Sequence, residues 1–293
     1  MHVSWRKRLS RTLRGRLRST VLARHGVGVV ANTQNGLLVV DPHDFNVSRA
    51  LLAQGAYDWS EVCWLSGLLH EESRMVFVGA HIGALLVPLA LRSGSRAIVA
   101  FEPSPRNFTL LKMNLALNGL TAVAACQRAV GAEAGSVRFT ENRLNTGNSR
   151  LSELGEVVVE MTTLDAALSS AKIDLLVMDT EGSEARAIQG APRSLNQTRY
   201  LYVEYGPEQL VEQGSSPAAF IDLVASHFGS MYLPGTSSTD PPGKNATFFP
   251  SRTYVRYLRE LPSHRGLLLN LLFSNDTEAN GALLETPAPV TPR

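Results

Sequence analysis

A glycine loop, one glutamate and one acidic cluster are the residues of this sequence whose types and spacing suit chemistry. The loop follows the apolar segment 75–78 and consists of Gly79, Ala80, His81, Ile82 and Gly83. Glu102 ends the next apolar segment, about 20 residues further along. The string "DTEGSE" adds Asp179, Glu181 and Glu184 after a later one. Glycines let a backbone approach a ligand closely and carboxylates accept hydrogen bonds and protons, so this set predicts a ligand site with acid–base groups beside it.

The spacing of the loop distinguishes between two ligands that such a set can hold, NAD and S-adenosylmethionine. In both, a carboxylate after the second strand can accept hydrogen bonds from two ribose hydroxyls. Dinucleotide loops read GxGxxG because a pyrophosphate needs clustered backbone N–H groups at a helix N-terminus. Here the loop reads GxxxG, with histidine at position 81. S-adenosylmethionine carries a positive sulfonium and no phosphate, so a shorter glycine turn beside acids favours it, and NAD is the alternative.

Alternating apolar runs predict the elements that position these residues. Strands are predicted at 36–40, 75–79, 97–102, 122–126, 156–162, 173–179, 199–205 and 266–274, with 156–162 at a sheet edge. Helices are predicted at 58–69, 83–92, 104–118, 183–190 and 216–228. Strands separated by helices indicate an α/β fold with a doubly wound, mostly parallel sheet. Ligands bind beyond the carboxyl ends of such strands, so the loop, Glu102 and Asp179 are expected to meet at one edge.

Composition divides the chain into four predicted parts: a basic N-terminal segment 1–25, a mainly helical preface 26–74, the α/β domain 75–274, and a disordered tail 275–293. Within the domain, the Pro/Gly/Ser/Thr-rich stretch 234–247 is predicted to be a mobile loop, and this loop and the preface are predicted to select the methyl acceptor. The two cysteines show no metal or disulfide spacing, and no apolar run reaches about 18 residues, which predicts a cytoplasmic protein without a membrane-spanning helix.

Charge is distributed unevenly along the chain. Residues 1–25 hold eight Lys and Arg and no acid, and removing these eight from the net charge of +2 leaves −6 for residues 26–293. The acidic body gives no indication of nucleic-acid binding. Apolar residues recur every fourth position from Trp5 to Val21. This stripe fits a basic amphipathic helix at an anionic membrane, a transit peptide, or a helix packed on the domain.

Several strings resemble the FkbM-type methyltransferase family in order and spacing, over roughly residues 75–206. They include "VFVGAHIG", "VAFEPSPRNFTLLKMNLALNGL", "TTLDAAL", "IDLLVMDTEGSEARAIQGA" and "YVEY". The resemblance implies a class I, Rossmann-like, S-adenosylmethionine-dependent enzyme of the kind associated with O-methylation of sugars and natural products. It departs from the family at Phe77, where an Asp that helps to hold the cofactor is common, and at His81, which is often Asn.

The resemblance also implies roles for the candidate residues. The loop from Gly79 to Gly83 would border the methionine part of the cofactor, Glu102 would bind its ribose, and Pro103 and Asn107 would shape the adenosine pocket. Asp179, Glu181 and Glu184 would form the acidic signature, and Glu204 would end the following strand. Purely structural roles remain open for these residues: a tight turn for the loop, a helix-terminal charge for Glu102, and helix capping for Asp179 and Glu181.

Together these observations predict an O-methyltransferase that acts on a hydroxyl of a small-molecule acceptor, a sugar or a secondary metabolite. Asp179 is the first candidate for the base that removes the hydroxyl proton, Glu181 the second and His81 the third. Glu184 and Glu204 are candidates for acceptor binding. A divalent metal ranks below a carboxylate base, and Asp179, Glu181 and Glu204 are its first candidate ligands. An NAD-dependent oxidoreductase, and a binding scaffold without activity that Phe77 keeps open, are the alternatives.

Overall fold

The computed structural model describes residues 27–142, 145–146, 150–151, 154–169, 171–234, 246–261, 266–276 and 278. The basic segment 1–25, most of the stretch 234–247 and most of the tail 275–293 lie outside these residues, and the predictions made for them stay predictions. Within the described part of the chain, none of the helices has the length and apolar character that crossing a membrane requires.

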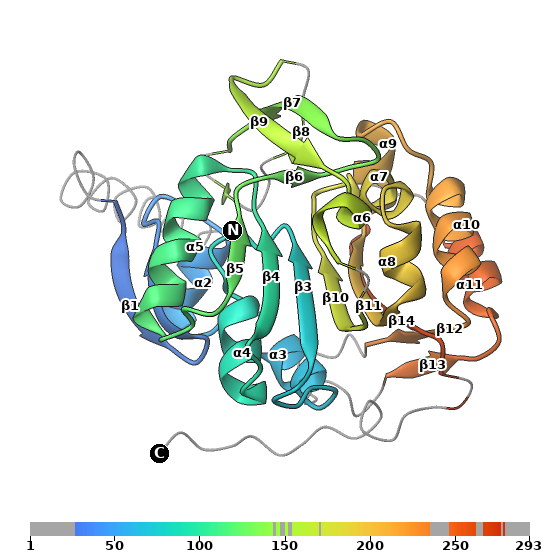
Figure 1. Cartoon of the computed structure of the whole chain (residues 1–293), viewed down its shortest axis with the longest axis horizontal. Helices are drawn as coiled ribbons and strands as arrows, with labels where there is room; N and C mark the ends of the chain where they lie inside the picture. Colours follow the sequence, from blue (N-terminus) through green and yellow to red (C-terminus); the bar gives the residue numbers. More distant parts are fainter. Residues whose placement is uncertain are drawn as a thin grey trace, which may run out of the picture.

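The core of the molecule is one eight-stranded sheet, whose strands are ordered β13-β12-β14-β11-β10-β3-β4-β5 (Figure 1). The strands are β3 Arg74–Val78, β4 Ala97–Phe101, β5 Ala124–Cys126, β10 Ile173–Met178, β11 Thr198–Tyr205, β12 Ser230–Leu233, β13 Thr247–Phe249 and β14 Leu269–Ser274. Pairing is parallel from β11 to β5, and β14 and β13 run antiparallel to their neighbours. The strand order reverses between β3 and β10, which confirms the predicted doubly wound sheet.

Helices cover both faces of the sheet, so its central strands are buried on both sides. They are α2 Val47–Gln54, α3 Trp59–Ser66, α4 Leu86–Ser93, α5 Pro105–Leu117, α6 Leu164–Ala167, α7 Glu184–Gln189, α8 Pro192–Asn196, α9 Pro207–Glu212, α10 Pro217–His227 and α11 Tyr254–Glu260. Strand β3 shows the arrangement clearly: Met75 and Phe77 enter one hydrophobic core, and Val76 and Val78 enter the other. This double burial explains why the segment reads as a continuous apolar run.

The preface 26–74 begins with a β-hairpin, β1 Val29–Thr33 and β2 Gly36–Val40, before α2 and α3. Strand β1 was not predicted from the sequence. Two asparagines one turn apart, Asn114 in α5 and Asn118 at its C-cap, hold the hairpin. Asn114 exchanges hydrogen bonds with the backbone of Val39, and Asn118 does the same with Leu37. The preface is therefore fixed to the sheet through α5, and α3 lies beside α4 on the same face.

A second sheet lies above the carboxyl edge of the first, with strand order β6-β9-β7-β8 (Figure 1). Its strands are β6 Ala129–Val130, β7 Gly135–Thr140, β8 Arg150–Leu151 and β9 Val157–Thr162. The prediction that 156–162 is an edge strand was wrong, because β9 pairs with β6 on one side and β7 on the other. Alternating side chains of this sheet, Phe139 and Val159 among them, bury a small core of their own.

Candidate active site

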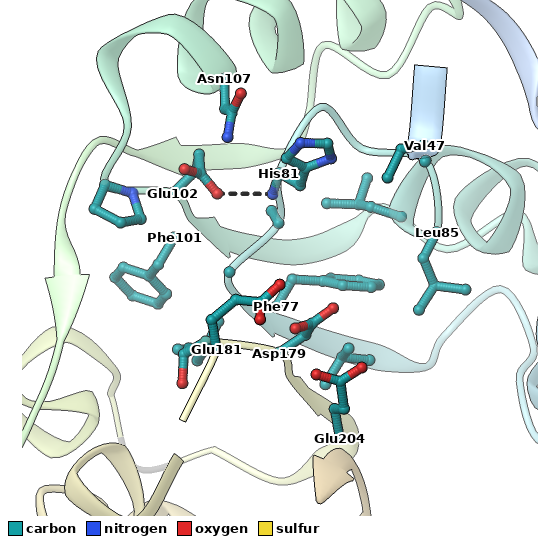
Figure 2. A pocket seen from close by; sticks show the side chains of 18 of the residues that line it. Val47, Phe77, His81, Leu85, Phe101, Glu102, Asn107, Asp179, Glu181 and Glu204 are labelled. Atoms are coloured by element: carbon teal, nitrogen blue, oxygen red, sulfur yellow. Dashed lines mark hydrogen bonds between the residues drawn. The ribbon is translucent and has the colours of Figure 1, made fainter. Parts of the chain in front are cut away.

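The carboxyl ends of β3, β4, β10 and β11 surround one cavity of about 250 Å³, at the point where the strand order reverses (Figure 2). The predicted residues that line it are Gly79, Ala80, His81, Glu102, Pro103, Asn107, Asp179, Glu181 and Glu204. Ile82, Gly83 and Glu184 lie outside the lining. Side chains from separate βα units thus meet in a single site, as expected for a doubly wound sheet.

The first loop glycine is needed by the protein's own packing. Gly79 has a φ of 84°, and a Cβ on it would lie 1.8 Å from the carbonyl oxygen of Asp179. The N–H groups of Gly79 and Ala80 both donate to the carbonyl of Phe101, at 2.9 Å each. The loop therefore connects β3 closely to β4 and β10, as a tight turn would. The same turn also forms part of the cavity wall.

The second half of the loop faces the core. Ile82 is 1% exposed and packs in the core below the loop, while its carbonyl accepts a hydrogen bond from Asn114. Gly83 has a φ of 85°, and a Cβ there would lie 2.9 Å from Leu111 Cδ1. These two residues hold the loop against α5 and leave the cavity contacts to the residues before them.

Glu102 connects the glycine loop to the start of α5. Its Oε2 accepts the backbone N–H of His81 at 2.8 Å (Figure 2), and its Oε1 accepts that of Ser104 at 2.9 Å. Burial raises the pKa of Glu102 to about 7, against these hydrogen bonds and one from Asn107, which favour the charged form. The string "EPSP" explains the geometry, since Ser104 caps α5 and Pro105 opens it. Glu102 is thus a hydrogen-bond acceptor that two backbone N–H groups hold in place on the cavity wall.

His81 adopts a left-handed conformation, with a φ of 51°, and its Nε2 lies 2.8 Å from Thr146 Oγ1. Burial lowers the pKa of His81 to about 4, so the ring is neutral at pH 7 and a weak base. Thr146 also donates its N–H to Asp44 and accepts from Asn107 Nδ2. Sequence reasoning missed Thr146, whose only signal is the polar stretch "NTGNSR" before β9.

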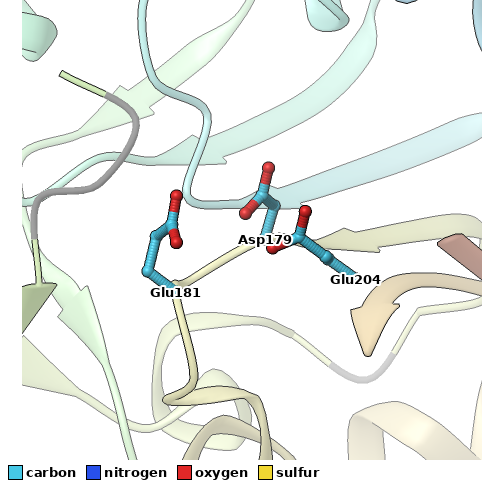
Figure 3. A group of neighbouring side chains, drawn as sticks. All are labelled: Asp179, Glu181 and Glu204. Atoms are coloured by element: carbon cyan, nitrogen blue, oxygen red, sulfur yellow. The ribbon is translucent and has the colours of Figure 1, made fainter. Parts of the chain in front are cut away.

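Three carboxylates gather on the opposite side of the cavity: one oxygen each of Asp179, Glu181 and Glu204 lies within 4.8 Å of the others (Figure 3). Asp179 is in contact with the open space of the cavity, although protein atoms surround the cavity. This burial raises the pKa of Asp179 well above its ordinary value, and Glu204 and Glu181 add to the shift. The pKa of Glu204 is raised for the same first reason. Gln209 donates to Glu181 at 2.6 Å.

Glu184, predicted to bind the acceptor, is turned toward its own loop. It is 2% exposed, and its Oε1 accepts the N–H of Thr180 at 2.7 Å, the Thr180 hydroxyl at 2.9 Å and the N–H of Gly182 at 3.3 Å. The N-cap residue of α7 is Ser183, and its side chain makes no capping hydrogen bond. Glu184 therefore shapes the acidic turn, which leaves Asp179 and Glu181 directed at the cavity.

The sheet, with its cavity at the point where the strand order reverses, is Rossmann-like. The chain belongs to the FkbM methyltransferase family: the family model described as "Methyltransferase FkbM domain" matches residues 78–231, more than half of the chain. This match confirms the family resemblance of the sequence.

Relatives of known name are methyltransferases too. The chain is 35% identical over 95 residues to 2-O-methyltransferase NoeI of Sinorhizobium fredii, which covers 31% of this chain and 39% of that protein. Over 200 residues it is 26% identical to methyltransferase sdnD of Sordaria araneosa, covering 55% and 77%. Methyltransferase 1 of Beauveria bassiana is 26% identical over 146 residues, covering 41% and 59%. The matches to the first and third of these span less than two thirds of the relative's length.

Among solved structures, a tRNA m1G37 methyltransferase of M. jannaschii aligns with a TM-score of 0.43 and 13% identity, over 88% of this chain and 57% of that one. M. jannaschii TYW2, solved in complex with AdoMet, aligns with a TM-score of 0.38 and 12% identity, over 81% and 82%. Scores this low carry no inference about the substrate.

Proposed function

We propose that this methyltransferase uses S-adenosylmethionine to methylate a hydroxyl of a sugar or a secondary metabolite. One observation carries the proposal: a single cavity presents Glu102 on one side and the carboxylates of Asp179 and Glu204 on the other (Figure 2). The first group suits a ribose and the second suits a positively charged donor and an acceptor hydroxyl. The relative NoeI is a 2-O-methyltransferase by name, which supports oxygen as the methylated atom.

The residues on the Glu102 side fit the donor. Both Glu102 oxygens are held by backbone N–H groups and still have lone pairs for ribose hydroxyls. Pro103 and Asn107 line the wall beside it, and the buried loop residue Ala80 brings backbone to the cavity. When bound, S-adenosylmethionine supplies an electrophilic methyl group on a positively charged sulfur, and the carboxylates opposite favour that charge.

Asp179 is the residue that we propose to take the proton of the acceptor hydroxyl. An alcohol does not ionise at neutral pH, so a base must receive its proton as the new bond forms. Burial and the neighbouring carboxylates raise the pKa of Asp179, which makes it a stronger base than an ordinary aspartate. His81, with its pKa lowered to about 4 by burial, is a poorer candidate. Asp179 also stands on a rigid strand end, since its N–H donates to Val78.

A divalent cation is the second candidate for activating the hydroxyl. The observation that favours it is the 4.8 Å grouping of oxygens from Asp179, Glu181 and Glu204. Carboxylate oxygens are the ligands that Mg²⁺ and Mn²⁺ prefer, and a bound cation lowers the pKa of a coordinated hydroxyl. Activity that is lost in a chelator and restored by magnesium or manganese would favour this version. Full activity in the chelator supports the carboxylate base.

Phe77 bears on the alternative of a scaffold without activity. It is 2% exposed and part of the core, so the usual Asp of the family is replaced here by a packed aromatic ring. Carboxylates remain close by, because Asp58, Asp179 and Glu204 line the same cavity. We therefore propose an active enzyme, in which the positive groups of the donor face these acids.

Calorimetry with S-adenosylmethionine, S-adenosylhomocysteine and NAD tests the proposal. We expect the two sulfur compounds to bind and NAD to give no heat of binding. Binding of NAD alone would indicate an oxidoreductase. Incubation with isotope-labelled S-adenosylmethionine and a small-molecule extract of the source cells, followed by mass spectrometry, then tests transfer. A ligand that binds without any labelled product would support the scaffold.

A further inference from the structure

One face of the sheet builds the part of the cavity beyond Asp179. Strand register places Phe77 beside Val177, and Val177 beside Tyr202. All three line the cavity and belong to the same hydrophobic core. Because they occupy matching positions on adjacent strands, they form a continuous floor with two aromatic rings.

A polar row lies one step closer to the strand ends. Side chains two residues apart share a face of a strand, so Asp179 follows Val177 and Glu204 follows Tyr202 on the floor side. Glu204 is paired in register with Asn270 of β14, and Asn270 also lines the cavity. The cavity therefore has an aromatic floor and a wall of hydrogen-bond acceptors.

The preface contributes the remaining side through Tyr57 and Asp58, which directly precede α3 and line the cavity. The fully buried Asn35 fixes this segment with three hydrogen bonds. It accepts the N–H of Tyr57 at 2.9 Å, and it donates to the carbonyls of Tyr57 at 2.7 Å and Ala84 at 2.9 Å. Asn35 thus ties the segment to the end of the glycine loop, and Asp58 is held in a left-handed conformation with a φ of 42°.

Negative charge in this part is not balanced by cations from the described lining. Arg128 and His81 are the basic residues there. Arg128 is paired with Glu160 at 3.0 Å and half exposed, and His81 is neutral. Asp58 keeps exposed surface toward the cavity, yet burial, with Glu61 and Glu204 adding to it, raises the pKa of Asp58 to about 7.

We propose that these residues form the acceptor half of the cavity, and that it selects a hydroxyl-bearing ring without negative charge. The acceptor half consists of Tyr57, Asp58, Phe77, Tyr202, Glu204 and Asn270, and Tyr57 and Asp58 are its specificity residues. Carboxylate and amide oxygens accept hydrogen bonds from ring hydroxyls, and aromatic rings contact the apolar face of a ring. A carboxylated or phosphorylated acceptor would place its negative charge beside Asp58 and Glu204, where the described lining offers no unpaired cation for it. The inference rests on the proposed function.

Saturation-transfer NMR on the protein loaded with S-adenosylhomocysteine tests this selection with three probes: methyl glucoside, methyl glucuronide and methyl glucosaminide. We expect the neutral glucoside to bind and the anionic glucuronide to bind at least about tenfold more weakly. Equal or tighter binding of the glucuronide, or no signal from any probe, overturns the inference. The cationic glucosaminide should bind at least as well as the glucoside, because the same acids attract a cation, and binding weaker than that of the glucuronide also overturns the inference. Failure to load S-adenosylhomocysteine, seen separately by calorimetry, refutes the proposed function and the inference with it.

Two conservative variants test which residues set the preference for the glucoside over the glucuronide. Asp58→Asn removes the charge but tolerates the left-handed backbone, and should narrow the preference for glucoside over glucuronide at least about threefold. Tyr57→Phe removes a hydroxyl that hydrogen-bonds to Asp58 and should weaken glucoside binding. Glu72→Gln, an exposed acid outside the cavity, is the matched control and should change neither. An Asp58→Asn protein that behaves like the control would remove Asp58 from the acceptor half.

Discussion

The two sides of the cavity hold their carboxylates in opposite ways. Glu102 has each oxygen held by a backbone N–H, and the groups that hold it belong to the glycine loop and the start of α5. Asp179 instead lies beside Glu204 and Glu181; burial raises the pKa of Asp179, and these two carboxylates add to the shift. Burial raises the pKa of both groups, but backbone hydrogen bonds oppose the shift at Glu102, whereas the neighbouring carboxylates add to it at Asp179.

This difference separates binding from reaction. A carboxylate whose position is fixed by backbone contributes a preorganised acceptor and can recognise a pair of hydroxyls. A carboxylate crowded by like charges gains affinity for a proton, which is the property of a general base. Changes on the Glu102 side should therefore alter affinity for the donor, and changes on the Asp179 side should alter turnover.

Gly79, which lies between the Glu102 side and the Asp179 side of the cavity, is the position where we expect the largest effect of a substitution. Gly79→Ala places a Cβ within 1.8 Å of the Asp179 carbonyl oxygen, at a φ of 84° that alanine disfavours. We expect a loss of at least about 3 kcal/mol in the free energy of unfolding, measured by denaturant titration. Gly135→Ala, where a Cβ meets nothing within 4 Å, is the control. A Gly79→Ala protein of ordinary stability would show that the strand ends can move apart.

Asp179→Asn tests the Asp179 side of the cavity alone, because asparagine has the size of aspartate but cannot act as a base. We expect turnover to fall at least about a hundredfold, because a general base contributes about 10²–10⁴-fold. Affinity for S-adenosylmethionine should change less than about tenfold. Labelled-methyl incorporation and calorimetry measure the two quantities. Lost affinity with normal turnover at saturation would make Asp179 a donor-binding residue.

Glu102→Ala breaks the binding side. The side chain is 4% exposed and links two backbone segments, so its loss removes both the ribose partner and part of the wall. Affinity for S-adenosylhomocysteine should weaken at least tenfold, or about 1.4 kcal/mol, measured by calorimetry. Circular dichroism establishes that the variant is folded. Unchanged affinity in a folded variant would place the ribose elsewhere.

The pH dependence of binding gives the smallest expected effect and sharpens the comparison. The pKa of Glu102 is raised to about 7 by burial, so a ligand whose hydroxyls need the carboxylate must displace a proton at lower pH. Affinity for S-adenosylhomocysteine should therefore fall by up to about tenfold from pH 8 to pH 6. Calorimetry in buffers of different ionisation enthalpy counts the protons released. Glu102→Gln should flatten the profile, and a profile that persists in this variant would assign the proton to another group.

Both the predicted sheet and the core of the site follow from local signals. Residues 75–78, 97–101 and 173–178 are short apolar runs followed by glycine or acid, and parallel strands buried on both faces produce that pattern. Since such strands end at one edge, their last residues meet, and Gly79, Glu102 and Asp179 line one cavity. The roles of these residues stay predictions until the variants are measured.

The sequence did not show where a side chain points or which group it contacts. Glu184 lies in the acidic string with Asp179 and Glu181, yet its carboxylate is used by the backbone of its own loop. The segment 156–162 alternates like an edge strand, and the structure gives it two partners in a second sheet. In each case the sequence pattern marks a polar or half-buried residue without specifying the group that it contacts.

The sequence by itself determined the family, the βα units that begin with β3, β4, β10 and β11, and the position of the cavity, because these depend on periodicity and on motifs within single βα units. Only the tertiary structure decided what closes the cavity. Asn35 holds Tyr57 from 22 residues away and Ala84 from 49, and this contact brings Asp58 to the acids of β10 and β11. No local pattern encodes such a contact, since it forms only when the hairpin docks on α5 and α3 covers the sheet.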